Sequence, residues 1–494
     1  MTTSEADVSD AAAPLLVGWA SRDITPRRPV ALRGQFNLRI ATRANDPLTL
    51  TALALESGGE QAIMVSIDSC GADNVVLGRA RDALRSRLPG FEPTKLIASG
   101  THTHTAPFAG TPGGLQDDND YLDELLARYP DYMSAAEYTE LLVEALVSAA
   151  CEAWDQRRPG HVAWGYSYAV VGENRRVRYF DDRAVMYGQT NDPGFSHIEG
   201  HVDHSANLLF TYDAAKRLTG MVINLACPSQ ASEGGQDYVS ADYWHDVREV
   251  VRGRYGADLF ILPQCSAAGD QSPHRLIAAR AEERMLRLKY GDGLDRGCNL
   301  GLRRDLARRI ADAVGDAEPA ARLELHDRVV LKHEQRRLDL PHWDLSEAEH
   351  AALQAEIAEL REQLEALGES DRLGGAYTSV RSRLIWCQEA AARYGNPLKS
   401  IPVEMNVTRL GDLALVTVPF EYYLDFGDRI KGRSAALQTF IVQLAGSGGY
   451  LPTERAAAGL SYGAIPASCE VSPAGGQVLV EEAVATIAGM FAEQ

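Results

Sequence analysis

Two histidines in the segment THTHTAP, residues 101–107, are the strongest chemical signal in the chain. The segment follows TKLIASG, which has the pattern of a short apolar strand. In a continuing strand His102 and His104 point to the same side, because side chains alternate with period two, whereas in an irregular turn they diverge. Imidazoles at a strand end are frequent zinc ligands, at a place where α/β folds bind ligands. The alternative is that one or both only hydrogen-bond to nearby backbone.

A turn that presents a serine follows a second apolar run. The segment GDQSP, residues 269–273, comes after LFILPQCSAA, and Pro273 stiffens its exit. This placement suits Ser272 as a nucleophile or a substrate-binding hydroxyl, and it makes Asp270 a candidate catalytic carboxylate. The spacing is not that of the GxSxG elbow of α/β-hydrolases. A turn capped by its own Asp or Ser side chain would have the same pattern.

Two later loops carry further candidates. In VTVPFEYY, residues 416–423, an apolar strand ends at Pro419 and Glu421 follows at once. A carboxylate at a strand end can be a metal ligand or a general base, although a surface glutamate fits this position too. In GSGGYLPTE the glycines let the backbone approach a ligand closely, with Tyr450 at the edge. A plain hairpin loop has a similar composition.

The elements around these residues indicate an α/β class. Two strands, TLTALALES and QAIMVSID, precede a helical pattern in VVLGRARDALRSRL, and the strand TKLIASG follows. This strand–helix–strand order predicts a βαβ unit. Strand patterns recur in HVAWGYSYAVV, NLLFTYD and TGMVINLAC. Further helices are predicted over residues 135–153, 242–255 and 302–315.

The clearest helix is predicted over residues 345–372, where apolar residues recur at helical spacing and charged residues fill the other faces. We expect a surface helix packed on its own domain, and the alternative is a coiled-coil surface for a partner. No repeat or linker divides the chain. Residues 15–494 are therefore predicted to form a single catalytic domain, after a disordered tail over residues 1–14.

Charge and cysteine usage exclude several partners. The 494 residues carry a net charge of −19, which argues against nucleic acid or an anionic membrane surface as the main partner. Seven scattered cysteines without a CxxC pair favour a reducing compartment. The polar N-terminus lacks the pattern of a signal peptide, and no apolar run is long enough to span a membrane. We expect a cytoplasmic protein without stable membrane association that acts on a small molecule. Neither a monomer nor a homo-oligomer is excluded.

Taken in order, the motifs resemble the catalytic domain of neutral ceramidases. The resemblance covers almost the whole chain and implies a mixed-sheet α/β domain, here without the C-terminal immunoglobulin-like module of the extracellular members. Its motifs are VGWASRDITP (17–26), Asp46–Leu48, Asp68, THTH, Asn174–Arg175, Gly269–Pro273, Pro419–Glu421 and Tyr450–Thr453.

The resemblance also implies a site. The family binds one zinc ion through two histidines, a glutamate and a tyrosine, and His102, Glu421 and Tyr450 match three of these. His104, Arg175 and Tyr462 match residues that contact substrate, and Ser272 matches a serine important for activity. The implied mechanism is hydrolysis by a water molecule whose pKa the zinc lowers, with His104 or a neighbour handling protons.

One ligand departs from the family. Its second histidine ligand lies in an INxxxHP segment, and this chain has INLACPSQ, with Cys227 in that place. A thiolate is a good zinc ligand, so Cys227 is one candidate. His245 is a reserve candidate, and absence of the metal is a third possibility. His201 and His204 are further histidines that a polar loop explains equally well.

The expected substrate is small and soluble. A chain with neither secretion signal nor C-terminal module is poorly placed to take sphingolipid from a membrane, so the leading hypothesis is zinc-dependent hydrolysis of a soluble amide-like compound. The second hypothesis is cleavage of a glycosidic or lactone bond in carbohydrate catabolism, where carboxylates such as Asp270 would act. The third is a metal-free binding protein, motivated by Cys227.

Overall fold

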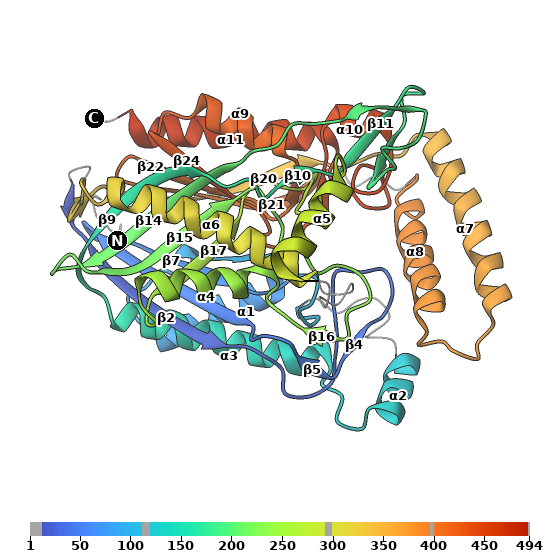
Figure 1. Ribbon diagram of the computed structural model, residues 1–494, viewed down its shortest axis with the longest axis horizontal. Helices are drawn as coiled ribbons and strands as arrows, with labels where there is room; N and C mark the ends of the chain where they lie inside the picture. The colour runs from blue at the N-terminus through green and yellow to red at the C-terminus, as the bar shows by residue number, and fades with distance from the viewer. Residues whose placement is uncertain (1–11, 111–118, 292–298, 396–399, 493–494) are drawn as a thin grey trace, which may run out of the picture.

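The largest element of the structure is an eight-stranded mixed sheet with the order β17-β15-β14-β9-β2-β6-β7-β8 (Figure 1). The computed structural model describes residues 12–110, 119–291, 299–395 and 400–492. In this sheet β7 pairs with β8 and β15 pairs with β17 in parallel, while the other neighbours are antiparallel. The strands are β2 Leu16–Asp23, β6 Thr49–Ser57, β7 Glu60–Ile67, β8 Leu96–Gly100, β9 Arg158–Tyr168, β14 Ser205–Asp213, β15 Leu218–Leu225 and β17 Phe260–Cys265.

A second, four-stranded sheet has the order β20-β21-β22-β24. Its strands are β20 Leu331–Pro341, β21 Ser400–Leu410, β22 Leu413–Thr417 and β24 Gln438–Val442. The main helices are α1 Asn74–Arg87, α3 Ala135–Asp155, α4 Tyr243–Tyr255, α6 Leu300–Ala321, α7 Glu347–Leu367, α8 Gly375–Ala391, α9 Leu424–Arg433 and α11 Pro473–Phe491. Shorter helices are α2 Asn119–Arg128, α5 Ala279–Tyr290 and α10 Glu454–Gly459.

The sheet forms because its strands have two apolar faces. In β6, Leu50, Ala52 and Ala54 pack in one cluster with helices α1 and α3. The alternate residues Leu53 and Leu55 pack in a different cluster on the opposite face. Side chains of a strand alternate between faces, so a strand that is apolar throughout must be covered on both. The helices cover one face, and the other sheet supplies the cover for the second.

The central core joins the two sheets. Its residues come from β6 in one half of the eight-stranded sheet, from β14 and β15 in the other half, and from β22 and β24 of the four-stranded sheet. The two halves of the large sheet meet at β2 and β9, which share only the pairs Leu16↔Pro159 and Val17↔Arg158. Helices α4 and α6 cover the β14–β15 half, and α9 and α11 cover the outer face of the small sheet, along the top of Figure 1. The protein is thus an α/β fold with its helices outside.

The predicted βαβ unit is present as β7, α1 and β8. The expected helices over 135–153, 242–255 and 302–315 correspond to α3, α4 and α6. None of the described helices is both long and apolar enough to span a membrane. Residues 1–11 of the predicted tail lie outside the described residues, but Ala13–Pro14, expected in that tail, form strand β1 and pair with β19 (Arg328–Val329).

The helix predicted over 345–372 is α7, and it forms an arm with α8 (Figure 1). Its start is fixed by a capping box between Ser346 and Glu349. The arm has its own small apolar cluster, in which Leu353 and Ile357 of α7 face Leu384 of α8. The helix therefore packs within its own chain.

The ends of strands from both sheets meet at a two-residue segment, Gln443–Leu444. The Gln443 N–H donates to the carbonyl of Cys265 at the end of β17, at 3.0 Å. The Leu444 carbonyl accepts from the N–H groups of Ala72 and Gly100, which follow β7 and end β8. The fully buried side-chain oxygen of Gln443 accepts from two more N–H groups, those of Ala268 at 3.1 Å and Tyr422 at 3.0 Å. Four loops are fixed at this point.

We predict that Gln443→Leu lowers the free energy of unfolding by about 3 kcal/mol, because it leaves two buried N–H groups without an acceptor. Denaturant titration measures this change. The matched control is Gln354→Leu on the exposed face of α7, which we expect to shift stability by less than about 0.5 kcal/mol. Equal stability of the two variants would contradict the role of Gln443.

Candidate functional site

His102 lies in a strained turn directly after β8. The strand ends at Gly100, and His102 has a left-handed backbone with φ of 65°, unusual for a residue other than glycine. Two hydrogen bonds hold the turn, from the N–H groups of His102 and Thr103 to the Ser69 carbonyl. Since Ser69 follows the parallel neighbour β7, the βαβ unit itself brings residues 68–70 beside the histidines.

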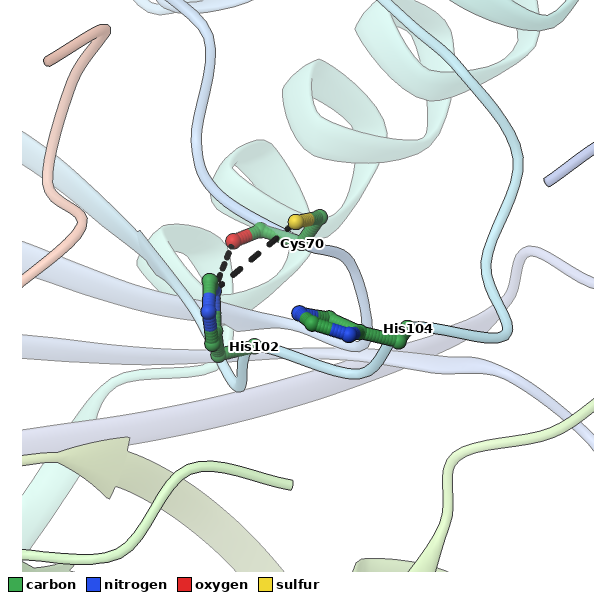
Figure 2. A group of neighbouring side chains, drawn as sticks. All are labelled: Cys70, His102 and His104. Carbon is green, nitrogen blue, oxygen red and sulfur yellow. Dashed lines mark hydrogen bonds between the residues drawn. The ribbon is translucent and has the colours of Figure 1, made fainter. Parts of the chain in front are cut away.

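The His102 ring has its two nitrogens in different environments. Nδ1 lies 2.7 Å from the Cys70 carbonyl oxygen (Figure 2). A carbonyl only accepts, so Nδ1 carries the proton and Nε2 is unprotonated in the neutral ring. Nε2 is buried, has no hydrogen-bond partner among the described residues, and lies 3.2 Å from Oε2 of Glu421.

The register of two short strands places Glu421 beside Tyr450. Strand β23 (Glu421–Tyr422) pairs in parallel with β25 (Tyr450–Leu451), with Glu421 opposite Tyr450. The buried guanidinium of Arg175 donates to the Tyr450 hydroxyl at 3.0 Å and lies 3.7 Å from Glu421 Oε2. Burial opposes ionisation of Glu421, but a His102 ring that is protonated when no metal is bound, together with Arg175, holds its pKa below the ordinary value. The structure therefore brings His102, Glu421, Tyr450 and Arg175 together.

Asp270 positions this group. Strand β10 (Glu173–Asn174) pairs with β18 (Gln271–Ser272), which sets Arg175 next to the GDQSP turn. Oδ2 of Asp270 accepts from the Asn174 amide at 2.7 Å, and Oδ1 accepts from the Leu424 N–H at 3.0 Å. Both carboxylate oxygens are thus used within the protein. These contacts favour a positioning role over the predicted catalytic one.

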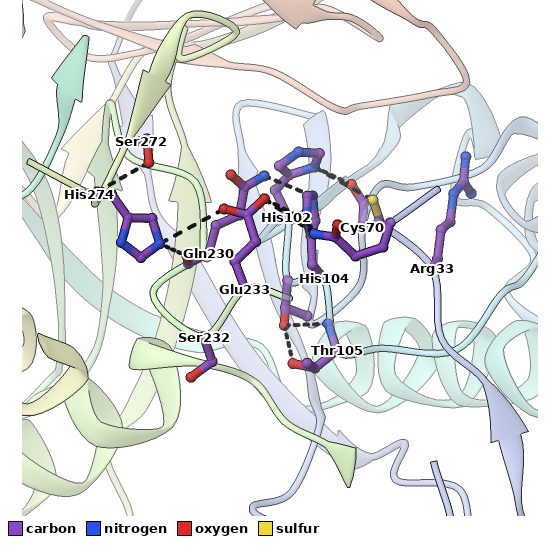
Figure 3. Close-up of polar contacts among 12 residues, drawn as sticks. Arg33, Cys70, His102, His104, Thr105, Gln230, Ser232, Glu233, Ser272 and His274 are labelled. Atoms are coloured by element: carbon purple, nitrogen blue, oxygen red, sulfur yellow. Dashed lines mark hydrogen bonds and ion pairs between the residues drawn. The ribbon is translucent and has the colours of Figure 1, made fainter. Parts of the chain in front are cut away.

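His104 faces polar residues from other segments. Its ring lies 5.0 Å from the His102 ring, so the irregular turn keeps the two imidazoles adjacent. The Gln230 amide nitrogen lies 2.8 Å from Nε2, and Oε1 of Glu233 lies 3.5 Å from Nδ1 (Figure 3). A side chain at Gly34, whose φ is 105°, would collide with the His104 ring at 2.4 Å. Glycine is therefore required there for the ring to fit.

Ser272 is buried and accepts two hydrogen bonds. The Tyr187 hydroxyl donates to its Oγ at 3.0 Å, and the His274 N–H donates at 3.1 Å. No imidazole or carboxylate among the described residues hydrogen-bonds to this Oγ. A serine nucleophile needs an adjacent base, so the contacts favour the second expectation, a hydroxyl that binds substrate.

A buried charge network holds the THTHT segment in place. The hydroxyls of Thr103 and Thr105 both donate to the Ser240 carbonyl at 2.9 Å. The Ser240 hydroxyl in turn donates to Asp46, whose carboxylate also pairs with Arg303 at 2.9 Å. Asp46 begins the Asp-Pro-Leu motif. The Asp-Pro-Leu motif thus contributes indirectly, because it fixes the segment that carries the histidines.

Cys227 points into the protein core. Its thiol donates to the Val171 carbonyl, with a sulfur–oxygen distance of 3.3 Å, and it packs in the cluster between β15, α4 and α6. Burial raises the pKa of this thiol well above its ordinary value. The described contacts do not bring it to His102, so the prediction that it ligates the metal gains no support. Cys227 follows the end of strand β15, as predicted, but its side chain points into the core cluster of β15, α4 and α6.

His245 lies in the first turn of α4, and none of the described contacts joins its ring to the site. The described site instead includes residues absent from the sequence-based prediction: Cys70, Tyr187, Gln230, Glu233 and His274. Cys70 carried a signal, since it follows the end of β7 just as His102 follows β8. The others lie in loops whose patterns carry none.

Cys70 forms a second group of possible ligands with the two histidines. Ligand atoms of Cys70, His102 and His104 lie within 4.8 Å of one another. The Cys70 sulfur lies 3.8 Å from Nδ1 of His102. Burial alone would raise the pKa of this thiol, but the adjacent histidines hold it well below its ordinary value.

Comparison with known proteins agrees with this architecture. No protein-family model matches the chain. It is 28% identical to a neutral ceramidase of Oryza sativa subsp. japonica over 155 residues, which are 31% of this chain and 18% of that relative. The neutral ceramidase structure from Pseudomonas aeruginosa has a TM-score of 0.66 at 17% identity, covering 96% of this chain and 74% of that one. The chain has the neutral ceramidase fold.

A solved ceramidase complexed with C2 gives a similar result, with a TM-score of 0.64, 16% identity and coverage of 96% and 75%. The predicted resemblance to neutral ceramidases is therefore confirmed at the level of the fold. The predicted mixed-sheet α/β class is also confirmed, and no immunoglobulin-like module occurs within the described ranges.

We predict that Cys227 of the native protein resists alkylation by iodoacetamide whether or not a chelator is present, because its thiol is buried in the core. Labelling should be at least about tenfold slower than at the partly exposed Cys151, as judged by peptide mass spectrometry. If a chelator alone made Cys227 reactive, a metal ion would be shielding it, and the core assignment would be wrong.

Proposed function

We propose that the chain is a metal-dependent hydrolase that cleaves an amide-like bond in a small soluble substrate, with zinc as the metal. The fold supports a hydrolase, and the donor set supports the metal. Imidazole nitrogen and carboxylate oxygen are the ligands of catalytic zinc sites, and one ion per chain is expected. Six described cysteines are free, which supports a reducing compartment, and we propose the cytoplasm.

The observation that carries the proposal is the facing of His102 Nε2 and Glu421 Oε2 at 3.2 Å. With Nδ1 protonated toward Cys70, a neutral ring presents a buried lone pair to a carboxylate whose side chain is 16% exposed, and two facing acceptors need a cation or a proton between them. Two atoms bound to one zinc ion at about 2.0 Å are roughly 3.3 Å apart, which fits this separation. The residues present therefore fit the metal.

The ligands would be His102, Glu421 and Tyr450. The alternative set of Cys70, His102 and His104 shares His102, but the sulfur lies on the Nδ1 side of that ring, and Nδ1 already donates to a carbonyl. We therefore assign the metal to the Glu421 side. Tyr450 is held for this role by Arg175, which donates to its hydroxyl.

The metal, when bound, supplies water activation and carbonyl polarisation. The residues of the chain supply the rest. Arg175 neutralises the charge that Glu421 brings into a buried place. The Tyr187–Ser272 pair offers hydroxyls that can hold the polar end of a substrate. His104, between Gln230 and Glu233, can take up and release a proton, since its two nitrogens differ in partner. No observation favours the glycosidic or lactone alternative or a metal-free binding protein.

We predict about one zinc ion per purified chain, and well under half of that in His102→Ala and Glu421→Gln, because each loses one of few ligands. Elemental analysis after identical dialysis measures this. Cys227→Ser serves as the matched control and should keep its metal. Release of chromophore from a panel of N-acyl compounds, lost with a chelator and restored by zinc, tests the reaction. A metal-free wild-type protein whose hydrolysis ignores chelators would refute the proposal.

We predict that Ser272→Ala lowers kcat by about a hundredfold, the usual effect of losing a hydrogen-bonding group that acts in the transition state. The stability loss should be only about 1–2 kcal/mol, because Tyr187 and the His274 N–H each lose one acceptor. Ser57→Ala, a buried serine bonded to two backbone carbonyls, is the control for stability. Full activity per folded molecule in Ser272→Ala would make the serine purely structural.

A further inference from the structure

The residues around the candidate site form a partly exposed rim above a buried floor. His102, His104, Arg175, Ser272 and Tyr450 are buried. The side chains next to them are only partly buried, and they come from separate segments: Gln35, Phe36, Tyr187, Glu233, His274, Trp386 and Tyr462. These side chains are the partly exposed neighbours of the buried group, so their chemistry indicates which substrate the site can contact.

One side of the rim is polar and centres on Glu233. Its Oε1 accepts from the Gln35 amide at 3.3 Å, and its Oε2 lies 3.2 Å from the Tyr187 hydroxyl oxygen, whose single proton has Ser272 as its other acceptor. The nearest nitrogens of His104 and His274 are further away, at 3.5 and 3.8 Å (Figure 3). All these contacts are long, and the side chain is 21% exposed.

Glu233 keeps its charge at neutral pH. Burial would raise its pKa, but the hydrogen bond with His104 and the nearby positive groups lower it to about 2. A carboxylate has about four acceptor positions. With long contacts and partial exposure, Glu233 can accept further hydrogen bonds from a substrate.

The other side of the rim is aromatic. The Phe36 ring lies 5.0 Å from both the Trp386 ring and the Tyr462 ring. Trp386 and Tyr462 are nearly parallel, with an interplanar angle of 10°, and Tyr462 lies 5.3 Å from the buried Tyr450. This aromatic side therefore reaches from the surface to the proposed metal ligands.

The α7–α8 arm contributes to this aromatic side. Trp386 is on α8, and the hydroxyl of Thr378 on the same helix accepts from the Leu38 N–H at 3.0 Å. The segment anchored in this way carries Gln35 and Phe36, which are adjacent in sequence and belong to opposite sides of the rim. One short segment thus contributes a residue to each side of the rim.

We propose that the rim binds a hydroxylated ring, sugar-like in its chemistry, whose apolar face lies on Trp386 and Tyr462 while its hydroxyls donate to Glu233. An aliphatic chain would remove water from the Glu233 carboxylate and offer it no further hydrogen bond, which is costly. A purely polar chain would gain nothing from the exposed parts of the aromatic rings. A ring with one apolar face and edge hydroxyls satisfies both sides, in the manner of pockets that combine aromatic walls with a few polar groups.

The test uses two kinds of probe with the same amide and ring size. N-acetylglucosamine and N-acetylgalactosamine carry hydroxyls, whereas N-cyclohexylacetamide does not. We expect at least one acetylated sugar to bind wild-type protein roughly tenfold more tightly than the cyclohexyl compound, measured by calorimetry. Glu233→Gln should reduce that preference to about twofold or less, while Glu152→Gln, in a surface ion pair with Arg22, should keep it.

Trp386→Leu should weaken binding of both kinds of probe, with Trp343→Phe, which precedes α7 and bonds Glu349 on it, as the control. If the wild-type protein binds the cyclohexyl compound more tightly than the sugars, or binds neither sugar, the proposal is overturned. The proposal deepens the proposed function but can be separated from it. Sugar binding without hydrolysis of any N-acyl compound would leave the rim assignment in place and reject the hydrolase, whereas hydrolysis of apolar amides alone would do the reverse.

Discussion

The convergence of strand ends on Gln443 and Leu444 is the constraint on which the site depends. These residues follow β24 of the small sheet, and they bond to loops after β7, β8 and β17 of the large sheet. Because each of these loops carries a residue of the site, the positions of Cys70, His102 and Ser272 are set by backbone hydrogen bonds between the sheets. An amide side chain suits this place, since its oxygen can serve two buried N–H groups at once.

The site residues that could be predicted from the sequence are mainly those that directly follow an apolar strand. His102, Ser272 and Glu421 each follow an apolar strand, and the structure places all three at the convergence. Motif order added Arg175 and Tyr450, which no periodicity would single out. The sequence did not predict in which direction a side chain points once its strand has ended. Cys227 follows β15 as predicted, yet its thiol turns toward Val171. Whether a residue leaves a strand toward the site depends on the turn that follows, which tertiary packing decides.

The charges of the site are balanced in two layers. On the floor, Arg175 and the cation or proton that His102 and Glu421 require compensate buried carboxylate charge. At the rim, Glu233 lies among groups that favour its ionised form, but at distances that leave it open to solvent and ligand. Strong internal pairs in the floor fix geometry. The loose contacts at the rim allow the same type of side chain to serve in recognition.

The loop between β15 and β16 (Tyr238–Val239) links these two layers, and it is where this chain departs most from the ceramidase pattern. It begins with Cys227, in the place of a family histidine, and continues with Gln230, which bonds His104, and Glu233 at the rim. A change in this loop would therefore alter both the surroundings of the proposed metal ligands and the groups of the rim. The proposed ligands His102, Glu421 and Tyr450 are held by other loops, so their positions do not depend on the residue at position 227.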